Sequence, residues 1–87
     1  MAHYILLMKL RQDLTKETIK KLQKIKRSLG PKAKGFVFFL TMGRYDLAWH
    51  IEAANNEDAM RVAVKFNKIA STETMPAIVL EQADMVL

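Results

Sequence analysis

Residues 35–53 of this 87-residue chain read GFVFFLTMGRYDLAWHIEA, a pattern that predicts two antiparallel strands joined by a tight turn. Gly43 and Arg44 lie at its centre, and a glycine at the first central position favours a type II′ turn. With that turn, large apolar residues face each other across the hairpin: Met42 and Tyr45, Leu40 and Leu47, Phe38 and Trp49, and Phe36 and Ile51. We expect helices to cover this face.

The other face of the hairpin mixes polar and apolar side chains. The same register pairs Thr41 with Asp46, Phe39 with Ala48, Val37 with His50, and Gly35 with Glu52, and the parity of the first strand adds His3, Ile5, Leu7 and Lys9. A bulge would shift this register by one residue and exchange the two faces. The apolar members form too large a patch for the surface of a monomer, so a second copy is expected to cover them in a two-fold homodimer.

The flanking segments complete an alternating pattern of strands and helices. We expect strands at 3–10, 35–42, 45–53 and 72–81, helices at 15–29 and from Asn55 or Asn56 onward, and a short tail at 82–87. Thr15 is the expected cap of the first helix, and Pro76 indicates that the last strand lies at a sheet edge. The order β-α-β-β-α-β predicts one α+β domain over residues 1–87, with a ferredoxin-like four-stranded antiparallel sheet.

Composition restricts the location and the chemistry. The chain has no cysteine, which excludes disulfides and thiolate metal sites and favours a cytoplasmic location. The first residues have no basic start and no small-residue cleavage site, so they predict a strand and not a signal peptide. No apolar stretch approaches the roughly 20 residues of a membrane span.

The net charge of +5 comes from one segment. Residues 16–34 contain eight Lys or Arg and one acid, whereas the remainder has more acids than bases. Lys16, Lys20, Lys24 and Arg27 form a stripe on the predicted helix 15–29, which raises a nucleic-acid-associated role as one alternative. The chain has no helix-turn-helix, no RNP-type aromatics and no arginine-rich arm, and this favours an ordinary solvated face.

Three motifs resemble the GYD-domain family. They are GRYD at 43–46, AWHIEAANNEDAMRVAVKF at 48–66 and TET at 72–74, and the likeness in spacing and strand order extends over nearly the whole chain. The resemblance implies a dimeric α/β-barrel in which two ferredoxin-like sheets face each other, and it implies no activity. Other families of this fold include small monooxygenases, ring-cleavage isomerases and the amino-acid-sensing domains of transcription regulators, whose hairpin the Gly-x-Tyr-Asp motif also resembles.

Four side chains are candidate ligand-binding residues: His50, Asp46, Glu52 and His3. His50 lies in mid-strand and could act as a base, whereas Asp46 could instead accept hydrogen bonds that hold the hairpin. The start of strand one lies near the end of strand three, which places His3 close to Glu52. No local spacing such as HxH or HExxH accompanies them, so neither a metal nor another cofactor is predicted.

We therefore expect a homodimeric α/β-barrel protein that binds or senses a small molecule. The alternative is a cofactor-independent monooxygenase or isomerase in which His50 or Asp46 moves protons. No GxSxG motif and no Ser-His-Asp pattern support nucleophilic catalysis, and the three glycines form no phosphate loop.

Overall fold

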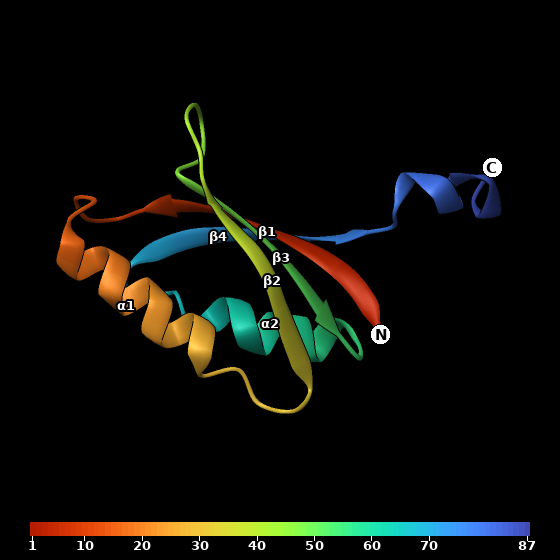
Figure 1. Ribbon diagram of the computed structural model, residues 1–87, viewed down its shortest axis with the longest axis horizontal. Coiled ribbons are helices and arrows are strands. Elements are labelled where there is room, and N and C mark those ends of the chain that lie inside the picture. The colour runs from red at the N-terminus through yellow and green to blue at the C-terminus, as the bar shows by residue number, and fades with distance from the viewer.

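The computed structural model describes residues 1–87 and shows the ferredoxin-like α+β fold (Figure 1). The elements in chain order are β1 (Ala2–Leu10), α1 (Lys16–Arg27), β2 (Ala33–Leu40), β3 (Leu47–Ala53), α2 (Asn56–Val64), β4 (Ala70–Ala77) and η1, a 3₁₀ helix (Leu80–Met85). The four strands form one antiparallel sheet in the order β2-β3-β1-β4. The sequence prediction of fold class is confirmed.

The sheet order places β1 at the centre and β4 at an edge. Pro76 has no backbone N–H to donate, and the edge position of β4 leaves one side of that strand without a partner. Both helices lie on the same side of the sheet (Figure 1). Neither helix has the length and apolar composition that crossing a membrane requires.

The core lies between the sheet and the helices. Its largest fully buried side chains are Trp49, Phe66, Leu6, Met8 and Ile51. The ring of Trp49 stacks on Phe38 at 4.8 Å between centroids and meets the edge of Phe66 at 5.8 Å. The alternation along β3 is strict, because every odd residue from Leu47 to Ala53 is buried.

Side-chain caps begin both helices. Thr15 Oγ1 accepts a hydrogen bond from the Thr18 amide at 3.2 Å, and Asn55 Oδ1 accepts one from the Asp58 amide at 2.9 Å. Asn56 has a different role, since its Oδ1 accepts a 2.7 Å hydrogen bond from the Tyr4 hydroxyl. Asn55 is therefore the N-cap of α2, and Asn56 fastens the first turn of that helix to β1.

The register of the hairpin agrees with the prediction near the turn and departs from it farther away. Leu40 pairs with Leu47, Phe38 with Trp49 and Phe39 with Ala48, as predicted. A β-bulge follows between Gly35 and Phe38, so that Gly35 pairs with Ile51 and Lys34 with Glu52. The predicted pairs Phe36–Ile51 and Gly35–Glu52 are wrong by this one residue, and the bulge leaves Phe36 and Val37 together opposite His50.

Trp49 gives the physical reason for the bulge. A Cβ atom on Gly35 would lie 2.5 Å from Cζ2 of Trp49, so the indole occupies the space that a side chain at position 35 would need. The indole Nε1 also donates a 3.2 Å hydrogen bond to the carbonyl oxygen of Phe36. Gly35 therefore faces the helices, and Phe36 turns to the opposite side of the sheet.

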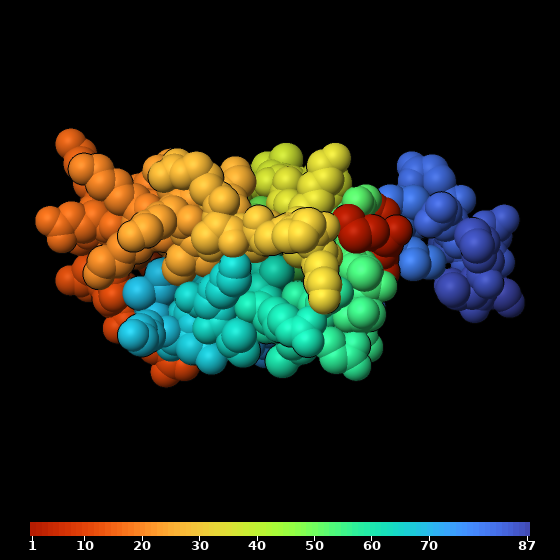
Figure 2. Space-filling model, turned by 90° about the horizontal axis from the view of Figure 1, so that it is seen from below, coloured from red at the N-terminus to blue at the C-terminus, as the bar shows by residue number.

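The C-terminal segment differs from the prediction of a strand to residue 81. β4 ends at Ala77, and η1 contains no buried residue. Figures 1 and 2 show this segment projecting from the rest of the chain.

Candidate functional site

No helix covers the face of the sheet opposite α1 and α2, which we call the open face. Its side chains are His3, Ile5, Leu7, Lys9, Lys34, Phe36, Val37, Phe39, Ala48, His50, Glu52, Ser71, Glu73, Met75 and Ala77. Val37 and Phe39 are 57% and 55% exposed, and Ile5 and Leu7 are half-buried between β3 and β4. An antiparallel sheet usually presents a polar surface to water on its uncovered side, whereas this one mixes these apolar side chains with polar ones.

Three of the four predicted site residues meet at one end of the open face. Register pairs His3 on β1 with Glu52 on β3, and Ile5 with His50. The two imidazoles are joined by a hydrogen bond of 2.9 Å between Nδ1 of His3 and Nε2 of His50. Oε1 of Glu52 lies 3.5 Å from the same Nδ1 of His3. His3 on β1 therefore contacts two residues of β3: Glu52, its register partner, and His50, which lies diagonally across from it.

Phe36 and Lys34 complete the surroundings of the histidines. The bulge turns the Phe36 ring onto His50, where the two rings stack with centroids 4.5 Å apart and planes at 16°. Nζ of Lys34 lies 5.2 Å from the centroid of the Phe36 ring, within the range of a cation–π contact. The stacked Phe36 ring holds the His50 imidazole in one orientation beside a cation.

The cluster has unused hydrogen-bonding capacity. The bond between the histidines uses Nδ1 of His3 and Nε2 of His50, so Nε2 of His3 and Nδ1 of His50 have no partner within the chain. These nitrogens can donate or accept according to tautomer, and a carboxylate oxygen of Glu52 can accept. The three side chains do not form a group placed to hold a metal ion.

Asp46 lies away from this cluster. Its Oδ2 accepts a 2.8 Å hydrogen bond from the Leu10 amide, and its own amide donates to the Met8 carbonyl at 2.8 Å. The carboxylate therefore fastens the hairpin to the end of β1. Thr41 stabilises the same turn by donating from its hydroxyl to the Tyr45 carbonyl at 2.8 Å. The structure does not bring Asp46 together with His3, His50 and Glu52.

Tyr45 departs from its predicted position beside Trp49 on the helix side. Its hydroxyl donates a 2.5 Å hydrogen bond to Oε2 of Glu73, which lies on the open face opposite Leu7. This hydrogen bond, partial desolvation and the nearby carboxylate charge together raise the pKa of the Tyr45 hydroxyl above 10.0. The sequence contained no local signal for this contact, because 28 residues separate its two members.

Comparison with known proteins supports the fold. No protein-family model and no curated protein matches the chain. The crystal structure of FFRP-DM1 is similar with a TM-score of 0.62 and 27% identity, covering 90% of this chain and 100% of that one. The crystal structure of the hypothetical protein PHS023 from Pyrococcus horikoshii has a TM-score of 0.58 and 23% identity, with 94% and 95% coverage. Both comparisons give a small α/β protein and do not confirm the GYD-type family.

Proposed function

We propose that this protein is a homodimer joined through the open face, and that it binds a small polar molecule at His3, His50 and Glu52. The hydrogen-bonded histidine pair on an uncovered face that also exposes Val37 and Phe39 carries this proposal. Packing a second sheet about 10 Å away would remove Val37 and Phe39 from water. It would also surround the polar cluster with apolar walls, as small-molecule sites commonly have.

The chemistry of the cluster favours a ligand that carries a carboxylate. When both rings are neutral and share their hydrogen bond, one of the two outer nitrogens, Nε2 of His3 or Nδ1 of His50, donates to the ligand and the other accepts. Lys34 adds a positive charge next to Phe36. Glu52 can accept a hydrogen bond from a donor on the same ligand. The resemblance of the Gly-x-Tyr-Asp hairpin to amino-acid-sensing domains supports a binding role rather than catalysis.

The test is a thermal-shift screen with the twenty amino acids and simple mono- and dicarboxylic acids. At least one compound should raise the melting temperature of the wild-type protein, because a ligand that binds only the folded state stabilises it. The His50→Ala variant should lose that shift and keep the same mass in light scattering. Loss of the dimer in His50→Ala would assign a structural role to His50 and contradict its role in binding.

Asp46→Asn is the matched control for the loss of a predicted site residue. Asp46 holds the hairpin and lies outside the cluster, so the shift caused by the compound should persist in Asp46→Asn, although the melting temperature itself falls. Equal loss of the shift in both variants would show that the effect reflects general destabilisation. A wild-type monomer at micromolar concentration would contradict the proposed homodimer.

A further inference from the structure

The segment of residues 78–87 exposes apolar side chains that the rest of the chain leaves uncovered. Leu80 is 83% exposed and Val86 is 70% exposed, and no residue of η1 is buried. In a 3₁₀ helix, side chains three residues apart lie above one another. This spacing aligns Leu80, Ala83 and Val86 in one apolar row, and places Glu81 and Asp84 in the neighbouring row.

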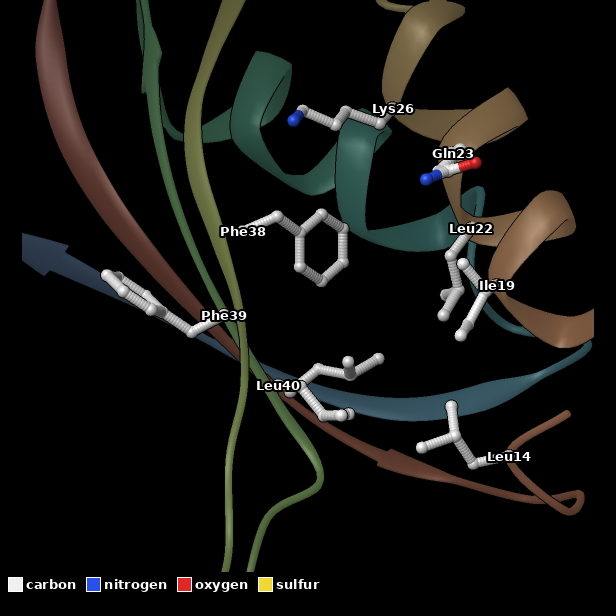
Figure 3. Close-up of a pocket in the computed structure, with 9 residues that line it drawn as sticks. Leu14, Ile19, Leu22, Gln23, Lys26, Phe38, Phe39 and Leu40 are labelled. Carbon is white, nitrogen blue, oxygen red and sulfur yellow. The ribbon is translucent and has the colours of Figure 1, made fainter. Parts of the chain in front are cut away.

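A groove between α1 and β2 presents the complementary features. It has a volume of about 210 Å³ and is lined mainly by apolar side chains, among them Leu14, Ile19, Leu22, Phe38 and Leu40. Figure 3 shows the Phe38 ring facing Leu22 and Ile19 across the gap. The volume lies below the roughly 300–1,000 Å³ of pockets that enclose drug-sized ligands. The groove therefore fits one or two side chains of a peptide.

The α1 wall of this groove is basic. Gln23 and Lys26 line the groove itself. Lys16, Lys20, Gln23 and Arg27 follow one another at spacings of three or four residues, so they form a row along the border of the groove. All of these lysine and arginine side chains are exposed, and no acidic residue lies within this row. A segment with acidic side chains beside an apolar row matches this border in charge.

The two complementary surfaces lie far apart within one molecule. Figures 1 and 2 place α1 toward one end of the longest axis and residues 78–87 at the other end. That axis extends 42 Å. The segment of one copy is therefore placed to reach the groove of another copy.

We propose that residues 78–87 of one copy dock into the α1–β2 groove of a second copy. Leu80 and Val86 enter the apolar groove, and Glu81 and Asp84 lie against Lys26 and the basic row of α1. The contact is on the helix side of the sheet, so it is separate from a dimer formed through the open face. It would connect such dimers into larger assemblies and does not depend on their formation.

Fluorescence anisotropy with a labelled peptide of sequence IVLEQADMVL, residues 78–87, tests this docking. The receptor is the full chain carrying Leu80→Ser and Val86→Ser, because these changes prevent its own segment from competing. The peptide should bind saturably, and Lys26→Glu in the receptor should weaken binding about fivefold, the scale of one or two exposed ion pairs. A peptide carrying Glu81→Lys and Asp84→Lys should recover the affinity for the Lys26→Glu receptor.

Lys21→Glu is the matched control, because it makes the same change of charge at an exposed lysine of α1 that lies outside the basic row. It should leave the affinity within about twofold of the parent receptor. Equal weakening by Lys21→Glu and Lys26→Glu would indicate a non-specific charge effect and overturn the docking site. Absence of saturation at millimolar receptor would overturn the proposal as well.

Amide chemical shifts locate the contact and separate it from the open face. Docking in the groove should move the resonances of Ile19, Leu22 and Leu40, and the same shifts should occur in a Val37→Glu background that removes the sheet-to-sheet dimer. Shifts centred on Val37 and His50 would place the peptide on the open face and overturn the proposal. Binding of octanoate in the groove without binding of the peptide would assign the groove to a small molecule.

Discussion

At the scale of single residues, the contact of Gly35 with Trp49 sets the shape of the hairpin. Gly35→Ala would place a Cβ 2.5 Å from Cζ2 of a fully buried indole, which packs against Phe38 and Phe66 and has little room to move. We expect a loss of about 1–3 kcal/mol in the free energy of unfolding, the usual cost of overpacking a core. Urea denaturation followed by Trp49 fluorescence measures it.

Gly30→Ala is the control for that substitution. A Cβ at Gly30 meets nothing within 4 Å, so this variant should change stability by no more than about 0.5 kcal/mol. Equal stability of Gly35→Ala and the wild type would mean that the bulge relaxes without cost, and would remove Trp49 as its cause.

The Tyr45–Glu73 hydrogen bond gives a second prediction at this scale, a dependence on alkaline pH. Glu73 raises the pKa of Tyr45 in the folded chain, so the protonated hydroxyl is favoured there. The resulting stabilisation is fully present below about pH 10 and is lost as pH rises through the raised pKa. Glu73→Gln should lower the pKa of Tyr45, as measured by NMR titration of ring-labelled tyrosine. An unchanged titration curve would show that the hydrogen bond does not persist in solution.

At the scale of elements, the stability of α2 depends on the side-chain cap that Asn55 provides. Asn55→Ala removes the acceptor of the Asp58 amide, and we expect a loss of about 1 kcal/mol in the free energy of unfolding. Asn55→Asp should retain most of the stability, because aspartate is an equally good cap. Thermal unfolding measured by circular dichroism compares the two variants, and a similar loss in both would contradict the capping role.

The hairpin also shows which features of the elements the sequence could predict. Periodicity, caps and turn chemistry were sufficient for the order of the elements and for the pairing of Phe38 with Trp49. The bulge was not predictable because Phe36 and Val37 are both apolar, so either could face the helices without violating the pattern. Only the three-dimensional contact between Gly35 and the indole decides between them.

The same limit applies to the candidate site. The parity of the strands placed His3, His50 and Glu52 on one face, and the register brings them together. Phe36 was assigned to the wrong face for the reason just given, so its stacking on His50 was missed. Asp46 shares that parity and lies near the opposite end of the strand, where it bonds to Leu10. The alternation of side chains along a strand predicts which face of the sheet a residue lies on. The packing of the folded chain decides which residues of that face are in contact.

At the scale of the whole molecule, the open face determines how the chain associates. Val37 is 57% exposed on this face, so Val37→Glu should leave the folded monomer within about 0.5 kcal/mol of its stability. In a two-fold dimer the same change would place unpaired carboxylates in an apolar interface, where a buried charge is costly. In the Leu80→Ser, Val86→Ser background, which removes docking of the C-terminal segment, light scattering should therefore report twice the 10.0 kDa chain mass, and the single chain mass when Val37→Glu is added.

Met60→Glu is the matched control for this prediction, because it makes a similar change at a 53% exposed apolar residue of α2 on the helix side. It should retain the dimer if the open face is the interface. Loss of the dimer in Met60→Glu and its retention in Val37→Glu would place the interface on the helices. Because the His3–His50 pair lies on the same face as Val37, that result would also leave the histidines open to water and contradict an enclosed ligand site.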